Sequence, residues 1–314
     1  MKISVLVPKE EFNQQQQKTF SQVGSTVYAA SRKEITIEGI IKLVKDSEIL
    51  AIDPDLFGGF KKARERVTKV AESLPNLKGL ALSTTSYGWI DREYFKKRKI
   101  PVCNIPGYSR EAVAEHTLAL LLCLAKRIIV TDRKTQKGKY KLEMGFELKG
   151  KALGIIGLGS IGSRVAELAL GIGMKVIACN RSPKQIAGVE MKSFDEVLAE
   201  ADAISLNTTH EDKNKDLINK NQITKMKEGV IIVNTVDRDL VNEQDMAEAL
   251  KSGKIGAYAW EGENLEDTPL AGLENSVGIR AFAYYTKEAL DNLFQILVGN
   301  IIALANNNPQ NRVI

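Results

Sequence analysis

The stretch that most constrains this chain is KALGIIGLGSIG, residues 151–162. A short β-prone apolar run, Leu153 to Ile156, leads into three glycines, and the SRVAELALGIG that follows has the spacing of an amphipathic helix. A second β-prone run, 175–179, comes at the distance that a βαβ unit requires. A G-x-G-x-x-G pattern between a strand and a helix is typical of dinucleotide-binding folds. The sequence therefore predicts such a unit here.

Each glycine of the predicted turn has its own task. Gly157 makes the tight turn, Gly159 lets a pyrophosphate approach the backbone, and Gly162 lets the helix pack closely on the strand. Ser160 and Ile161 open the helix, whose unpaired N–H groups and partial positive charge favour a phosphate. The alternative is a Rossmann-like layer that binds nothing.

The composition is that of an ordinary globular protein, with 44% apolar and 26% charged residues in 314. This length allows two domains and a large core. The net charge of +5 is mild and spread along the chain, so it does not argue for a nucleic-acid partner. The densest basic runs, 61–66 and 96–99, fall in helix-like segments and are explained as solvated helix faces.

The cysteines and the apolar stretches bear on location. Cys103, Cys123 and Cys179 lie far apart in apolar segments and form neither a metal-binding nor a disulfide pattern, which favours inert thiols in a reducing compartment. The longest apolar stretch, 118–125, is too short to span a bilayer, and the N-terminal apolar run is too short for a signal peptide. We therefore expect a cytoplasmic protein with no membrane partner.

Strand and helix patterns alternate along the chain, which predicts the α/β class with parallel sheets. Four β-prone runs occupy the first hundred residues: 3–7, 26–30, 48–52 and 79–83. A second array of strands and helices follows the glycine turn. A long helix from about 286 to 308 then provides a return to the first domain, so we expect domain boundaries near 100 and 285.

Several segments resemble, in order, sequence blocks of the D-isomer-specific 2-hydroxyacid dehydrogenase family, which includes glyoxylate, hydroxypyruvate and phosphoglycerate enzymes. They are IPVCNIPGYSREAVAEHTLALLL, GKALGIIGLGSIGSRVA, MKEGVIIVNT, ALKSGKIGAYAW and the terminal NNNPQNRVI. The resemblance covers nearly the whole chain. It implies hydride transfer between a nicotinamide and a small 2-hydroxy or 2-oxo acid, in a homodimer.

The resemblance also implies two doubly wound parallel-sheet domains. A Rossmann nucleotide domain, 101–285, would be inserted in a flavodoxin-like substrate domain made of 1–100 and 286–314. Thr208 and Thr235, which follow predicted strands, are expected to bind the cofactor. In the family, the helix that carries the AEHT block helps to build the dimer, so His116 is expected to be structural rather than catalytic.

The choice of cofactor depends on the end of the second strand, where NAD enzymes normally place an acidic residue for the ribose hydroxyls. This chain has Asn180, Arg181 and Ser182 there. Arg181 would attract a 2′-phosphate that a carboxylate would repel, and the two polar side chains can donate or accept hydrogen bonds. NADP(H) is therefore favoured over NAD(H). The alternative is that Arg181 is a solvated loop cation.

The catalytic positions depart from the family pattern. The arginine that holds the substrate carboxylate is replaced by Asp237, and Arg238 reaches this position only if the alignment slips by one residue. At 4 Å and an effective dielectric near 20, such a charge change turns an attraction of roughly 4 kcal/mol into a repulsion of similar size, before screening. Binding of an ordinary 2-oxo acid should therefore be weakened.

The acid/base position is also changed. The family's histidine is replaced by Ala281, and the chain's two histidines, His116 and His210, lie outside this segment. His210 is in a polar loop and is expected to be solvated. Glu263 matches the glutamate that pairs with the histidine if one residue is deleted before it. The proton would then come from Glu263, from Tyr284 or Tyr285, or from water.

The segment TTSYGWID, 84–91, resembles the loop whose backbone N–H groups hold the substrate carboxylate in the family, which makes Ser86, Tyr87 and Gly88 candidate substrate-binding residues. Ser86 replaces the usual glycine, which is tolerable unless the position needs a positive φ. Trp89 and Trp260 are either pocket walls or core residues.

Two interpretations remain. The first is an NAD(P)-dependent oxidoreductase of this family with weak activity on ordinary 2-oxo acids. The second is a catalytically silent NADP(H)-binding protein that acts as a sensor or a partner subunit. No metal ligand set is expected in either.

Overall fold

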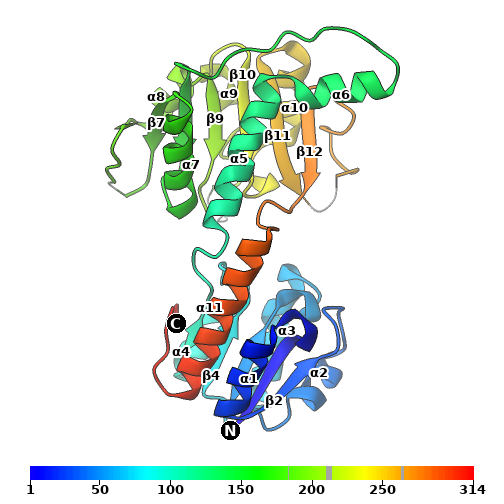
Figure 1. The fold of residues 1–314 in the computed structure, drawn as a ribbon, viewed down its shortest axis with the longest axis vertical. Coiled ribbons are helices and arrows are strands. Elements are labelled where there is room, and N and C mark those ends of the chain that lie inside the picture. Colours follow the sequence, from blue (N-terminus) through cyan, green and yellow to red (C-terminus); the bar gives the residue numbers. More distant parts are fainter. Residues whose placement is uncertain (183, 210–213, 263–264) are drawn as a thin grey trace. The chain divides into compact units, whose positions relative to one another are not determined.

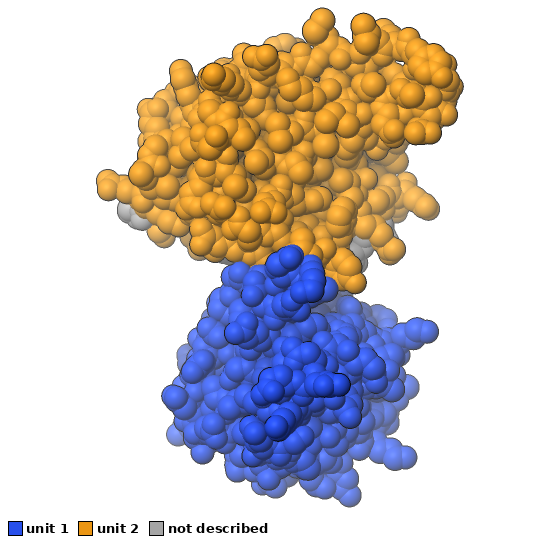
Figure 2. Space-filling model, viewed as in Figure 1, with its two compact units in different colours: residues 1–108, 287–314 blue, residues 109–286 orange. Residues whose placement is uncertain are grey.

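The computed structural model describes residues 1–182, 184–209, 214–262 and 265–314. The chain divides into two compact units, which Figure 2 shows in different colours. Unit 1 consists of residues 1–108 and 287–314, and unit 2 consists of residues 109–286.

Unit 1 is built on a parallel five-stranded sheet with the order β2-β1-β3-β4-β5, which is the flavodoxin-like order (Figure 1). The strands are β1 (Lys2–Pro8), β2 (Ser25–Ala29), β3 (Ile49–Ile52), β4 (Gly79–Leu82) and β5 (Val102–Cys103). The helices of this unit are α1 (Gln14–Val23), α2 (Ile37–Val44), α3 (Phe60–Glu72), α4 (Arg92–Lys97) and α11 (Lys287–Ala305).

The central strands of unit 1 are apolar because both faces of the sheet are covered. Every residue of β3 and β4 is buried, as expected for a parallel sheet between helices. One apolar cluster joins the sheet to α2, α3 and α4, and another joins it to α1 and α11. Gly79 allows the close approach of α11, since a Cβ there would lie 2.6 Å from Cδ2 of Leu304.

The helix α11 passes a length and composition test for a membrane span, but its apolar residues belong to the core of unit 1. Leu293, Leu297 and Ile301 lie in the cluster that packs on the sheet. Buried core helices often have this length and apolar composition, so these features of α11 are weak evidence for a membrane span.

The units divide after residue 108 and after residue 286, rather than after 100 and 285 as the sequence suggested. The first shift has a clear cause, because β5 lies between the two positions and completes the sheet of unit 1 beside β4. The C-terminal segment then closes on β5, where Val313 N donates to Val102 O (2.8 Å) and Asn104 N donates to Asn311 O (3.1 Å).

Among its described residues, unit 2 forms a parallel seven-stranded sheet with the order β12-β11-β10-β9-β6-β7-β8 (Figure 1). The strands are β6 (Ala152–Ile156), β7 (Lys175–Cys179), β8 (Val189–Met191), β9 (Ala203–Leu206), β10 (Val230–Asn234), β11 (Ile255–Gly262) and β12 (Ser276–Arg280). The helices are α5 (Arg110–Ala125), α6 (Ile128–Gln136), α7 (Ser160–Gly171), α8 (Phe194–Glu200), α9 (Lys220–Lys225) and α10 (Glu243–Ser252). The predicted fold class is therefore confirmed.

Two apolar clusters cover this sheet. The side chains of α5 and α7 pack on one face, and those of α8, α9 and α10 pack on the other. The strand order changes direction between β6 and β9, because β7 and β8 extend from one side of β6 and β9 to β12 extend from the other. In open α/β sheets, ligands bind at the carboxyl ends of the strands beside such a switch point.

Candidate active site

The glycine turn connects β6 to α7 at this switch point. Gly157 has φ +97°, and a Cβ there would lie 2.7 Å from the backbone nitrogen of Thr208. A Cβ on Gly162 would lie 2.1 Å from the carbonyl oxygen of Gly157. A Cβ on Gly159, by contrast, would meet no atom within 4 Å. Two of the glycines are thus required by packing, while Gly159 faces open space in which a ligand can approach.

The start of α7 is open to an anion. Gly159 is the N-cap and has no side chain to accept from the first N–H groups, which begin at Ser160 and Ile161. The first N–H groups of a helix have no partner within the helix, and the helix dipole adds a partial positive charge there. The turn and the helix start together provide the geometry that a phosphate needs.

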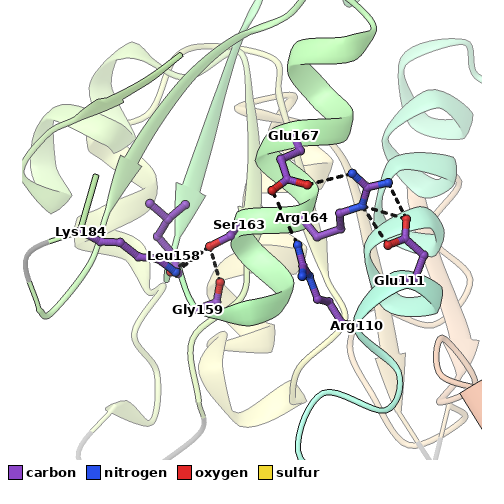
Figure 3. A network of polar contacts seen from close by, with 8 residues as sticks. All are labelled: Arg110, Glu111, Leu158, Gly159, Ser163, Arg164, Glu167 and Lys184. Carbon is purple, nitrogen blue, oxygen red and sulfur yellow. Dashed lines mark hydrogen bonds and ion pairs between the residues drawn. The ribbon is translucent and has the colours of Figure 1, made fainter. Parts of the chain in front are cut away.

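Two polar side chains brace the turn from the loop after β7. The Asn180 Oδ1 accepts from the Leu158 backbone N–H (3.0 Å), and its Nδ2 donates to the Ser182 carbonyl (2.8 Å). The Lys184 ammonium donates to the Leu158 carbonyl (2.7 Å) and to the Ser163 hydroxyl (2.8 Å), as Figure 3 shows. Lys184, a second cation in the same loop, is not among the cofactor-binding residues predicted from the sequence.

The Asn180 side-chain amide is therefore engaged in hydrogen bonds within the turn and its loop, whereas the side chains of the next two residues face solvent. Arg181 and Ser182 are both exposed. The Lys184 ammonium adds a positive charge directly beside the glycine turn. No acidic side chain occupies positions 180 to 182, where one would repel a 2′-phosphate.

The helix α5 is tied to α7 beside this turn by a charged network (Figure 3). The Arg164 guanidinium donates from Nε to Glu111 (2.8 Å) and from Nη1 to Glu167 (2.8 Å), and Arg110 lies 3.6 Å from Glu167. The hydrogen bond from Arg164 lowers the pKa of Glu111. These side chains are largely exposed, so the network positions α5 more than it stabilises the fold.

The two threonines follow strands on the other side of the switch point. The backbone of Thr208, just beyond β9, lies against Gly157 of the turn. Thr235 follows β10 directly, and its hydroxyl lies 3.4 Å from the Thr117 hydroxyl of α5. The structure thus brings α5 to the carboxyl end of β10.

After β10 the chain enters the short 3-10 helix Arg238–Leu240, and the Asp237 carboxylate caps it by accepting from Asp239 N–H (2.9 Å). Arg238 turns towards α10, where its Nε and Nη2 donate to the two oxygens of Glu243 (2.6 and 2.8 Å). Its guanidinium also lies 5.1 Å from the ring centre of Trp260. Arg238 is therefore held in a two-pronged ion pair.

Glu243 is fixed by a second donor as well, the Thr268 hydroxyl at 2.6 Å. Burial of this carboxyl opposes ionisation, but the hydrogen bonds from Arg238 and Thr268 prevail and lower its pKa. The ion pair with Glu243 and the contact with the Trp260 ring give Arg238 a structural role among the described residues.

Glu263 and His210 lie outside the described residues. The described carboxylate at the end of β11 is Glu261, whose side chain is 7% exposed. Its Oε1 accepts from the backbone N–H groups of Phe282 (3.2 Å) and Ala283 (3.0 Å) and lies 3.3 Å from His116 Nε2. His116 was expected to be structural, and its contact with Glu261 was not predicted from the sequence.

The residues around this pair differ in exposure. Ala281, which the sequence predicts to stand at the family's histidine position, is exposed, and so are Tyr284 and Tyr285. The imidazole of His116 meets the Phe282 ring edge-on, with 5.0 Å between ring centres.

The predicted substrate loop lies in unit 1, after β4. Trp89 Nε1 donates to the Thr84 hydroxyl (3.0 Å) and to the Ser86 carbonyl (2.9 Å), which fixes the loop. Ser86 does not have a positive φ, so the usual glycine is not required there. A Cβ on Gly88 would meet no atom within 4 Å, and the Tyr87 ring lies 5.5 Å from Arg92.

The two tryptophans are buried core residues. Trp89 is buried in the apolar cluster of unit 1 that contains α3 and α4, and Trp260 is buried in the cluster of unit 2 that contains α10.

Comparison with known proteins gives consistent matches. Residues 118–279 match the family described as "D-isomer specific 2-hydroxyacid dehydrogenase, NAD binding domain". The chain is 34% identical over 251 residues to D-3-phosphoglycerate dehydrogenase of Archaeoglobus fulgidus, a match that covers 77% of this chain and 48% of that protein. It is 32% identical over 260 residues to hydroxypyruvate reductase of Blautia hydrogenotrophica, with 78% and 81% covered.

A solved structure of similar fold is the acyclic imino acid reductase Bsp5 in complex with NADPH and D-Arg. It has a TM-score of 0.87 and 27% identity, and the match covers all of both chains. The match to the Archaeoglobus protein spans about half of that relative's length.

Proposed function

Because the chain belongs to the D-isomer specific 2-hydroxyacid dehydrogenase family, as its sequence indicated, we propose that it is an oxidoreductase that transfers hydride between a nicotinamide cofactor and a small hydroxy or oxo substrate. The observation that carries this proposal is the glycine turn, with Gly159 facing open space at an uncapped helix start. The nicotinamide supplies or accepts the hydride, and the chain binds and orients it.

The turn fits the pyrophosphate of such a cofactor. An added Cβ at Gly159 would fill the space that the phosphates need, and the N–H groups at the start of α7 are directed towards it. Unit 2 would then be the dinucleotide-binding domain, with Thr208 and Thr235 near the cofactor. Unit 1 would bind substrate through the loop that contains Ser86, Tyr87 and Gly88.

NADP(H) is the cofactor that we expect this site to prefer. Asn180 replaces the acidic residue of NAD enzymes, and Arg181 and Lys184 supply positive charge to the same loop. The similar imino acid reductase is also in complex with NADPH. The test is a fluorescence titration of the protein with NADPH and with NADH. Equal affinities, or tighter binding of NADH, would contradict the preference.

The substrate side is expected to be unusual. Asp237 stands at the position of the family's carboxylate-binding arginine, and Ala281 at the position of its histidine. We expect weak reduction of glyoxylate, pyruvate and hydroxypyruvate. A negative charge at 237 better suits a substrate with a cationic group. A steady-state assay of these acids with NADPH, and of D-arginine with NADP⁺, tests this choice.

The second candidate function is a catalytically silent NADP(H)-binding protein, a sensor or partner subunit. The same two substitutions favour it, because they remove the family's substrate cation and its acid. NADPH binding without turnover of any substrate in that panel would support this function over the first.

A homodimer in the cytoplasm is the expected context. Tyr140, Leu142 and Met144 are strongly exposed apolar side chains in the segment after α6, and a second copy of the chain would cover them. Sedimentation equilibrium, with and without serine at these three positions, tests the dimer. The structure shows Cys103, Cys123 and Cys179 as free thiols.

A further inference from the structure

A histidine and a buried carboxylate meet at the carboxyl edge of the unit 2 sheet. His116 lies in α5 with 17% of its side chain exposed, and Glu261 lies at the end of β11 with 7% exposed. The two are 3.3 Å apart, between His116 Nε2 and Glu261 Oε1. A charge buried to this degree is costly unless it is paired and hydrogen-bonded, so the close contact of these two ionisable groups calls for an explanation.

Glu261 is held in place by the backbone. The N–H groups of Phe282 and Ala283 both donate to its Oε1, the oxygen nearest to the imidazole. His116 Nε2 is buried and has no acceptor in line with its N–H among the described residues, so Glu261 is the charged group that faces it. The other neighbour of the ring is apolar, the side chain of Phe282.

The pair lies against the segment that follows β12, which is where the resemblance places the family's histidine. The two N–H groups that hold Glu261 come directly after Ala281, the position that has lost its histidine. On the other side, Thr117 follows His116 in α5, and its hydroxyl lies 3.4 Å from that of Thr235 at the end of β10. His116 is therefore set among the ends of β10, β11 and β12, within unit 2.

We propose that His116 replaces the missing histidine as the proton donor and acceptor, with Glu261 as its positioning residue; this inference rests on the proposed function. In the reductive direction, a bound reduced nicotinamide would supply the hydride that reduces the carbonyl carbon of the substrate. The imidazolium of His116 would give the proton on Nδ1, the ring nitrogen that does not face Glu261, to the carbonyl oxygen, so that a hydroxyl forms and a neutral imidazole remains. Water then returns the proton to His116.

The arrangement follows the usual logic of a general acid. A histidine supplies the proton, and a carboxylate fixed by other groups orients the ring and stabilises its charged form. What is unusual is the source of the histidine, which comes from α5 rather than from the segment after β12. A purely structural bridge between α5 and β11 would use the same contact, so the test must separate the two roles.

The test uses His116→Gln and Glu261→Gln, with His210→Asn as the control at the chain's other histidine. NADPH binding is measured first and should be nearly unchanged in all three, and the melting temperature shows that each variant is folded, with some loss expected when one partner of the buried pair is removed. Hydroxypyruvate reduction by NADPH is then followed from pH 5 to pH 9, in the wild type and in an Asp237→Arg background that supplies the missing carboxylate-binding cation.

We expect Asp237→Arg to reduce hydroxypyruvate without any histidine at position 281. In that background His116→Gln should lower kcat by about 10²- to 10⁴-fold and abolish the fall in rate at alkaline pH. Glu261→Gln should cause a smaller loss, because the imidazole ring loses the carboxylate that orients it. A structural bridge would not move the pH profile.

Three results would overturn the inference. The first is an unchanged rate and pH profile in His116→Gln, and the second is activity that appears only when Ala281→His is added. The third is NADPH binding without turnover in Asp237→Arg. A wild-type chain that binds neither NADPH nor NADH would instead refute the proposed function, and this inference with it.

Discussion

The glycine turn and the carboxyl edge of β10 to β12 belong to the same sheet but are built in different ways. The turn uses backbone: a positive φ at Gly157, an open position at Gly159 and the N–H groups of a helix start. The edge uses side chains, which come from strands and helices far apart in sequence, such as His116 and Glu261.

This difference explains why one region keeps the family pattern and the other does not. No other residue can replace a glycine whose Cβ would strike the backbone, so the turn must be retained in place. A side chain can be replaced by one from a neighbouring element, provided that its group reaches the same point. The change at Ala281 together with the pair made by His116 is consistent with such a replacement.

The largest effect is expected at the turn. Gly159→Val should weaken binding of NADPH by more than about 100-fold, because the new side chain occupies the space of the pyrophosphate. The fold should survive, since a Cβ at this position meets no atom within 4 Å. Fluorescence titration gives the affinity, and a thermal melt gives the stability.

Gly171→Ala is the matched control, because it lies at the other end of α7 and its Cβ also meets nothing within 4 Å. It should leave NADPH binding unchanged. Unaltered affinity in Gly159→Val would mean that the turn is not the cofactor site.

At the carboxyl edge of β10 to β12, Asp237→Arg should lower the KM for hydroxypyruvate by about tenfold or more. The change replaces a repulsion of the substrate carboxylate by an attraction, each roughly 4 kcal/mol before solvent and salt screen it. Asp237→Asn is the control, since it removes the repulsion alone and can still cap the 3-10 helix. If the two variants have the same KM, position 237 does not face the substrate carboxylate.

Much of the fold could be predicted because its signals are local. The apolar runs, their helical or β periodicity and the glycine turn all depend on neighbouring residues, and the two parallel sheets have the predicted class. The missed parts are short or depend on distant partners. β5 has only two residues and is completed by the C-terminal segment, and β8 is a three-residue strand at the sheet edge.

The candidate site could be predicted only where it depends on backbone. The sequence predicts that Asp237 and Ala281 stand at the family's arginine and histidine positions, but it does not predict which side chains lie near them. The contact of His116 with Glu261 joins residues from α5 and β11, and Arg238 finds its partner in α10. Such pairs follow from how the helices pack on the sheet, which no local pattern encodes.

A smaller effect on cofactor binding is expected in the loop after β7, where Arg181 and Lys184 should contribute differently. Arg181→Ala should weaken NADPH binding about tenfold, the loss of one charge-assisted hydrogen bond, and leave NADH binding unchanged. Lys184→Ala should weaken both cofactors by a few-fold, because its ammonium lies against the Leu158 carbonyl of the turn. Parallel titrations of both variants with both cofactors are the measurement. Equal losses for NADPH and NADH in Arg181→Ala would remove the case for a 2′-phosphate contact.

The smallest effect on catalysis is expected for the pair of Arg238 and Glu243. Variants of this pair test whether Arg238 has taken over the binding of the substrate carboxylate. Glu243→Gln should leave KM and kcat unchanged and lower the free energy of unfolding by about 1.5–3 kcal/mol at pH 7, because the hydrogen bonds to Arg238 lose their charge. The effect must depend on pH. The folded chain lowers the pKa of Glu243, so the stabilisation is complete above the ordinary glutamate value of about 4.3 and disappears as the pH falls through the lower folded value. Urea unfolding at pH 7, 5 and 3 should therefore show a difference between wild type and Glu243→Gln that is retained at pH 5 and shrinks towards pH 3.

Arg238→Ala, the partner variant, should destabilise the chain without raising the KM for hydroxypyruvate. A rise of tenfold or more would show instead that Arg238 binds the substrate, and that this edge has rebuilt its cation as well as its acid.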